Sequence, residues 1–262
     1  MPHHQKRLRS KLIHDEKPIG IQLQNTTLPL QERPQARPLD FVLLDDTILT
    51  FEPAMQQACK PLLEEQHLSL LIELQNNTIP HVLQACGFFA DGILIPDIHT
   101  EAEAKEMIDQ VLFPPTGKRR QSYIEQRLRE GSRTMRLLLR VLIDHQPMLI
   151  PICDNQDLLQ HMDGILSPDG IDGIFLDPVR LAAALDLPLW HDEMLSAMES
   201  VKAACHRAQK PCILLEAEGM EPYLAEPYDA FISLQNSNYT KSSCRAVFLN
   251  ARKAEDSEER YD

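Results

Sequence analysis

The stretch MLIPICDNQDLLQHMDGILSPDGIDGIFLDP, residues 148–178, contains two apolar runs separated by a helical segment. The runs are MLIPIC (148–153) and GIFLDP (173–178), and we expect a helix over Gln156–Leu166. Continuous apolar runs are typical of strands buried on both faces of a parallel sheet, whereas half-exposed strands alternate apolar and polar residues. This stretch therefore predicts two parallel strands joined by a helix.

The same pattern recurs along the chain. Helices are expected over Glu101–Leu112 and Asp192–Ala208, and six further runs have the length and composition of strands: 19–24, 41–46, 68–74, 92–97, 212–217 and 229–235. Eight strands alternating with helices in 262 residues predict a single (β/α)8 TIM barrel, with a doubly wound open sheet as the alternative. We expect the barrel to span residues 11–250, between a flexible N-terminus (1–10) and a charged C-terminal tail (251–262).

The charge balance excludes several classes of partner. Asp and Glu number 39 against 26 Lys and Arg, a formal net charge of −13, which repels nucleic acid and anionic membranes. No apolar run approaches the roughly 18 to 20 residues that span a bilayer. The basic N-terminus lacks the apolar core of a secretory signal, although a transit peptide is an alternative. We therefore expect a soluble cytoplasmic protein without nucleic-acid or membrane partners.

The cysteines form no zinc-binding pattern. No CxxC pair is present, so we expect reduced, buried thiols at all six positions: Cys59, Cys86, Cys153, Cys205, Cys212 and Cys244.

One segment departs from the acidic background. Residues 118–140 hold one lysine and seven arginines, and four of the arginines follow helical spacing: Arg129, Arg133, Arg136 and Arg140. We expect a homo-oligomer in which the Arg129–Arg140 helix contacts an acidic neighbour, because arginine is enriched at subunit contacts. An amphipathic helix with a solvated basic face is the alternative.

Most of the apolar runs end in acidic residues. These acidic residues are Asp45, Asp46, Glu73, Asp97, Asp154, Asp177, Glu216 and Glu218. In a barrel of this kind the C-terminal strand ends and the loops after them form the mouth of the active site. The alternative is that each acidic residue caps the next helix, a position that aspartate favours.

With the strands placed, several segments resemble the HpcH/HpaI family of class II pyruvate aldolases, related to the citrate lyase β subunit. They are KPIGIQLQ, DFVLLDD, GILIPDIHTEAEAKEMIDQVLFPPTGKR, GIDGIFLDPVRLAAALDL and WHDEM, in the family's order between Lys11 and Asn236. The resemblance implies a (β/α)8 barrel, often hexameric, that cleaves 4-hydroxy-2-oxo acids to pyruvate and an aldehyde. It also implies Mg²⁺, Mn²⁺ or Co²⁺ as the Lewis acid that stabilises the enolate.

Carried over position by position, most of the family's site residues are replaced. Cys153 and Arg180 stand at the two metal-ligand positions, Glu73 stands at that of an arginine, and Thr47 and Ile48 replace a Glu-His pair. Asp45 and Arg119, which we assign to catalysis and substrate binding, match the family. The alternatives are that Asp45 is a structural hydrogen-bond acceptor and that Arg119 orders its Pro-Gly turn by hydrogen bonding. An alignment shifted by one residue would instead place Asp154 and Asp177 at the metal positions, although such a shift reverses which way a strand side chain faces.

These replacements lead to specific expectations about the site. A guanidinium and a neutral thiol cannot replace the oxygen ligands of Mg²⁺ or Mn²⁺, so we expect no cofactor and no metal. Because the arginine and one acid have exchanged places, we predict an ion pair between Glu73 and Arg180 across the mouth; the alternative is that both point independently into solvent.

Cys153 is interpreted as a nucleophile activated by the field of Arg180 or as a packed, unreactive thiol. No motif places a histidine beside it. His99 and His145 are candidate bases only through their positions in loops.

Three functions follow from these candidate site residues, Asp45, Glu73, Cys153, Arg180 and Arg119. The first is a degenerate aldolase-family barrel without metal-dependent activity, acting as a binding, regulatory or assembly subunit. The second is a divergent carbon–carbon lyase that acts on 2-oxo acids without a metal. The third is a protein that binds a small oxo acid or carboxylate through Arg119 and Arg180.

Overall fold

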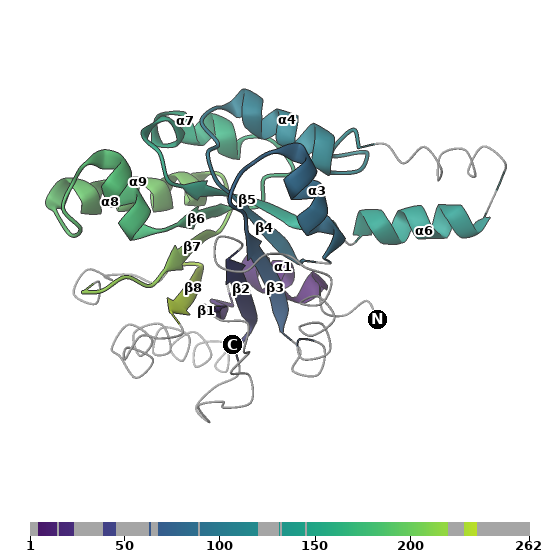
Figure 1. Cartoon of the computed structure of the whole chain (residues 1–262), viewed down its shortest axis with the longest axis horizontal. Coiled ribbons are helices and arrows are strands. Elements are labelled where there is room, and N and C mark those ends of the chain that lie inside the picture. The colour runs from purple at the N-terminus through teal and green to yellow at the C-terminus, as the bar shows by residue number, and fades with distance from the viewer. Residues whose placement is uncertain are drawn as a thin grey trace, which may run out of the picture.

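Eight parallel strands form a closed barrel in the computed structural model of the chain (Figure 1). Each strand pairs with the next, and β8 pairs with β1. The strands are β1 (Ile19–Leu23), β2 (Phe41–Asp45), β3 (Ser69–Glu73), β4 (Gly92–Ile95), β5 (Met148–Cys153), β6 (Ile174–Leu176), β7 (Cys212–Leu215) and β8 (Ala230–Leu234). The predicted TIM barrel is confirmed, and closure excludes the open sheet.

The structure describes most of the chain, in separate ranges. They are residues 5–14, 16–23, 39–45, 63, 68–88, 90–119, 131, 133–144, 146–219 and 228–234. Thr47, Ile48, His145 and the tail over residues 251–262 lie outside these ranges.

The strands are buried on both faces, as the continuous apolar runs predicted. In β5, Met148, Ile150 and Ile152 belong to the cluster inside the barrel, whereas Leu149 and Cys153 belong to the cluster between strands and helices. Successive side chains of a strand point to opposite faces, so this alternation fixes which strand-end residues can reach the mouth.

Helices pack around the barrel (Figure 1). They are α3 (Ile79–Gly87), α4 (Glu101–Val111), α7 (Gln156–Leu166), α8 (Pro178–Leu185) and α9 (Asp192–Arg207). The three helices expected from the sequence are present, each within one residue of its predicted end. Thr100 and Glu103 form a capping box at the start of α4, which explains why this helix begins at Glu101.

Helix α1 (Gln5–Ile13) closes the N-terminal end of the barrel. Leu8 and Leu12 are buried in the cluster inside the barrel, beside the first residues of several strands. Helix α1 therefore begins within the segment, residues 1–10, that the sequence predicted to be a flexible N-terminus. Two leucines four positions apart give this basic helix an apolar stripe, and the stripe covers the open end of the core.

Helix α6 (Arg133–Asp144) extends away from the strands (Figure 1). Its apolar side chains are unusually exposed: Leu137 by 65%, Leu138 by 41% and Val141 by 43%. Arg133, Arg136 and Arg140 of the predicted basic helix fall within it, and Arg129 lies outside the described residues. Within the described ranges, no helix has the length and apolar character needed to span a membrane.

Candidate active site at the C-terminal strand ends

Two acidic side chains stand next to each other at the C-terminal end of the barrel. Asp45 and Glu73 are the last residues of β2 and β3 and are partners in the strand register. Each follows the inward-facing positions of its strand, such as Leu43 and Leu71. Both are buried, with 5% of Asp45 and 1% of Glu73 exposed. These two predicted site residues therefore lie at the mouth.

Arg180 reaches Glu73 from the opposite side of the barrel. Its Nη2 donates to Glu73 Oε1 across 107 residues of sequence, and its Nε lies 3.4 Å from Asp177 Oδ2. The predicted Glu73–Arg180 ion pair is confirmed. Asp177 also caps α8 by accepting from the backbone N–H groups of Val179 and Arg180, which fixes the turn that carries the arginine.

Burial perturbs both members of this pair. Desolvation raises the pKa of Glu73 from 4.5 to about 7, although Arg180 opposes the shift, and the neighbouring charge of Asp45 adds to it. Desolvation lowers the pKa of Arg180, but Glu73 and Asp177 outweigh it, so the net shift is upward. Glu73 can therefore exchange a proton near neutral pH while Arg180 stays charged. Glu73 Oε2 is buried without a hydrogen-bond partner among the described residues.

Cys153, the last residue of β5, does not face the mouth of the barrel. Cys153 is fully buried in the cluster between strands and helices, and burial and the neighbouring Asp154 raise its thiol pKa. A thiol in this environment is a packed, unreactive core residue, which is the second of the two interpretations drawn from the sequence, and it does not act as a nucleophile at the mouth. The next residue, Asp154, continues the inward-facing series of β5, and Arg180 is close enough to lower the pKa that burial raises.

Arg119 lies at the other end of the barrel. Its backbone N–H donates to Leu112 O, its Nη1 lies 3.4 Å from Val111 O, and its guanidinium stacks 4.8 Å from the Phe113 ring centroid. These contacts are at the C-terminal end of α4, which runs away from the mouth. These contacts do not place Arg119 at the mouth for substrate binding, and they agree with the alternative in which it orders the turn after α4.

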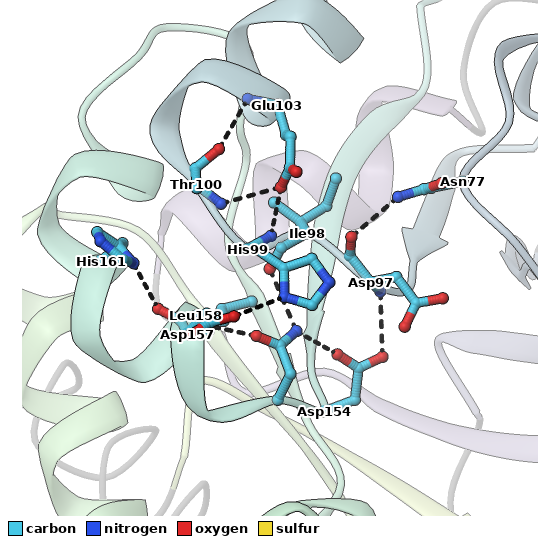
Figure 2. Close-up of polar contacts among 11 residues, drawn as sticks. Asn77, Asp97, Ile98, His99, Thr100, Glu103, Asp154, Asp157, Leu158 and His161 are labelled. Carbon is cyan, nitrogen blue, oxygen red and sulfur yellow. Dashed lines mark hydrogen bonds and ion pairs between the residues drawn. The ribbon is translucent and has the colours of Figure 1, made fainter.

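A polar network joins the loops after β4 and β5 (Figure 2). Asp97 N–H donates to Asp154 Oδ2 at 3.3 Å, and Asn155 Nδ2 donates to Ile98 O at 3.3 Å. His99 Nδ1 lies 3.2 Å from Asp157 Oδ2. The loops from two separate βα units are therefore held together at the rim.

The sequence named Asp97 and His99 only by their positions after strands, and it named Asp154 also as an alternative metal-ligand position. It did not identify Asp157. For Asp154, counting the alternation along β5 from Met148 would have shown that residue 154, unlike residue 153, faces inward.

The residues that the structure describes at the mouth do not form a site for the divalent metal that the family resemblance implies. Within the described part of the chain, no group of three or more His, Cys, Asp or Glu side chains is arranged to hold a metal ion. The oxygens of Asp177 are engaged by the α8 backbone and Arg180, and those of Asp154 accept from Asn155 and Asp97. A dication here would have to displace a guanidinium that carries a permanent positive charge, so the residues present do not fit it.

The chain is a closed parallel (β/α)8 barrel. Its charged cluster lies at the C-terminal strand ends, which is the end that carries the active site in enzymes of this fold. A family model described as HpcH/HpaI aldolase/citrate lyase matches residues 65–226. The chain belongs to the HpcH/HpaI aldolase/citrate lyase family, which confirms the resemblance seen in the sequence.

Individual relatives agree with this family. The chain is 28% identical over 189 residues to a hydroxypyruvate/pyruvate aldolase of Rhizorhabdus wittichii, covering 69% of this chain and 72% of that protein. It is 27% identical over 192 residues to a 2-keto-3-deoxy-L-rhamnonate aldolase of Klebsiella pneumoniae, covering 68% and 66% of the two chains. The crystal structure of an HpcH/HpaI aldolase/citrate lyase family protein from Burkholderia cenocepacia superposes with a TM-score of 0.72 at 19% identity, covering 94% of this chain and 98% of that one, and supports the fold.

Proposed function

We propose that the chain is a divergent carbon–carbon lyase of the aldolase type, acting on a small 2-oxo acid without a metal ion. The observation that carries the proposal is the position of Arg180, whose guanidinium is held at the barrel mouth by Glu73 and Asp177. Relatives named as aldolases support the reaction class.

Arg180 has the chemistry to bind the acid group of such a substrate. Its side chain is 35% exposed, so one edge of the guanidinium can face a ligand while the rest is held by carboxylates. A guanidinium binds a carboxylate or an adjacent keto oxygen through paired, charge-assisted hydrogen bonds. Fixed positive charge beside that oxygen stabilises the enolate that forms when the carbon–carbon bond breaks.

Glu73 adds a group that can move a proton. Its pKa of about 7 makes both protonation states available at neutral pH, which suits general acid–base catalysis. When Glu73 is protonated, its attraction for Arg180 weakens, and the guanidinium is freer to bind an anionic substrate.

The test measures pyruvate release from 4-hydroxy-2-oxopentanoate by the full chain, with EDTA, Mn²⁺ or Co²⁺ added. We expect turnover that is insensitive to EDTA and lost in Arg180→Ala. The matched control is Arg9→Ala, which removes an arginine from the Arg9–Asp172 ion pair at the far end of the barrel. Turnover that metal stimulates and chelator abolishes contradicts the proposal.

A second function, a degenerate barrel with an assembly role, is favoured by helix α6. Its exposed leucines and valine lie on a helix with three described arginines, in a chain with a net charge of −13. The occupant we propose is the acidic surface of a second copy of this chain. Light scattering of an Arg133→Glu, Arg136→Glu, Arg140→Glu variant tests it: a smaller particle supports the contact, and an unchanged one contradicts it.

We further propose that the protein works in the cytoplasm. The cysteines in the described ranges, Cys86, Cys153, Cys205 and Cys212, are free thiols, which a reducing compartment maintains.

A further inference from the structure

The loops after β4 and β5 bring a histidine and a carboxylate together at the mouth. His99 precedes α4, and Asp157 lies in the first turn of α7, 58 residues further along the chain. His99 Nδ1 is 3.2 Å from Asp157 Oδ2, and the histidine side chain is 39% exposed. A carboxylate on Nδ1 fixes the imidazole tautomer and leaves Nε2 with a lone pair that can accept a proton.

The backbone around His99 is fixed from several directions (Figure 2). Its N–H donates to Glu103 Oε2 at 2.7 Å, and the preceding Ile98 carbonyl accepts from Asn155. Asp97, two residues earlier, adopts a φ of 54°, a left-handed conformation that is strained for a residue with a side chain. Asn77 Nδ2 donates to Asp97 O at 2.9 Å and helps to hold it. These contacts fix the backbone segment that carries the imidazole at the rim.

Asp154 connects this pair to the Arg180 cluster. One of its oxygens accepts from the Asp97 backbone, and Asp154 and Arg180 are close enough to interact electrostatically. The His99–Asp157 pair and the guanidinium therefore belong to the same end of the barrel. A second described histidine near a carboxylate, His206, lies 3.7 Å from Asp229, which precedes β8 at the opposite end.

We propose that His99, oriented by Asp157, is a second proton-transfer residue that works with Arg180 and Glu73; this inference rests on the proposed lyase function. In the cleavage direction, Nε2 takes the proton of the C4 hydroxyl of a 4-hydroxy-2-oxo acid. The oxygen electron pair forms the aldehyde carbonyl, and the C3–C4 bond breaks. Its electrons form the pyruvate enolate, whose oxygen faces Arg180, and the proton returns from His99 to C3 to give pyruvate.

The test compares His99→Ala with the matched control His206→Ala in the full chain, using pyruvate release from 4-hydroxy-2-oxopentanoate. We expect kcat to fall about 100-fold in His99→Ala with little change in KM, because general base catalysis contributes about 10²–10⁴-fold. Added imidazole should restore part of the lost kcat in His99→Ala, which a purely structural role would not allow. His206→Ala should behave as the wild type.

Asp157→Asn is the second variant and reports on orientation. Because Asp157 holds the ring without touching the substrate, its loss should lower kcat by about tenfold, and imidazole should not restore it.

Different outcomes distinguish this inference from the proposed function. Turnover that is lost in Arg180→Ala but kept in His99→Ala overturns the role of His99 alone, as does a His99→Ala variant that imidazole does not restore. Absence of turnover in the wild type overturns the lyase function and the proton-transfer role with it.

Discussion

Each end of the barrel has a set of four carboxylates close to the strand ends, and the two sets have different partners. At the N-terminal end, Asp40, Asp91, Asp172 and Asp229 each accept from the backbone N–H at the start of the preceding odd-numbered strand, respectively Ile19, Leu70, Leu149 and Cys212. Three of these aspartates also have a cation of their own, since Lys11 pairs with Asp40, Arg9 with Asp172 and Lys17 with Asp229.

At the C-terminal end, four carboxylates surround one guanidinium. Asp45, Glu73, Asp154 and Asp177 all interact electrostatically with Arg180. Within the described part of the chain, Glu73 accepts from Arg180 alone, and its second oxygen has no hydrogen-bond partner. Asp91 is the exception at the N-terminal end, because its Oδ1 is also buried without a hydrogen-bond partner among the described residues. Carboxylates with a cation of their own stabilise the strand starts, whereas carboxylates that share one cation retain the ability to exchange protons and to bind a ligand. The comparison predicts that changes at the N-terminal end lower stability and changes at the mouth lower activity.

The largest expected effect is that of Arg180→Ala on catalysis. Removing the charge that stabilises the enolate should lower kcat/KM by about 10²–10³-fold. Steady-state kinetics measure this loss, with Arg9→Ala as the control at the opposite end. A similar loss of activity in both variants would mean that the two ends do not differ in function.

The next effect is a pH dependence carried by one carboxyl at each end. Burial raises the pKa of Glu73 from 4.5 to about 7 and that of Asp91 from 3.8 to about 7. The folded state therefore binds each proton more tightly than the unfolded state. The stability contributed by each group is fully present below its unfolded pKa, about pH 4, and is lost as pH rises through about 7, on the order of 3 kcal/mol per group.

Urea unfolding across pH 4 to 8 measures this dependence. Glu73→Gln and Asp91→Asn should each flatten part of the slope, but only Glu73→Gln should change the pH profile of turnover. An altered turnover profile in Asp91→Asn would contradict the separation of the two ends.

Much of the fold was predictable because the barrel strands are continuous apolar runs, and each of the eight lies within its predicted range. The ion pair was predictable because Glu73 and Arg180 exchange charges relative to the family pattern.

Arg119 was misplaced because a matched turn motif does not state at which end of the barrel the turn lies. The His99–Asp157 contact joins residues 58 positions apart, so only the packing of α4 beside α7 brings it about. The burial of Leu8 was missed because the surrounding residues are strongly basic.

A smaller effect is expected from Asp40→Ala. The substitution leaves the Ile19 N–H without its acceptor and Lys11 without its partner, in a region where the Asp40 side chain is 6% exposed. We expect the free energy of unfolding to fall by about 1–3 kcal/mol. Urea unfolding measures this change, and kcat should stay within twofold of the wild type. A variant of unchanged stability but reduced turnover would reverse the roles assigned to the two ends.

The smallest effect is expected from Cys153→Ala. This prediction compares the side chain that faces the helices at the end of β5 with the one that faces the mouth. Cys153 packs between the strands and the helices, so losing its sulfur leaves a small cavity and should cost about 1 kcal/mol of stability. Turnover should be unaffected, and thiol reagents should not inhibit the wild type, because the raised thiol pKa and full burial suppress the reactive thiolate. Asp154→Asn, one residue later on the inward face, should lower turnover instead, because it removes a carboxylate from the Arg180 cluster. Inhibition by a thiol reagent that Cys153→Ala abolishes would place the thiol at the mouth and refute the orientation argued for β5.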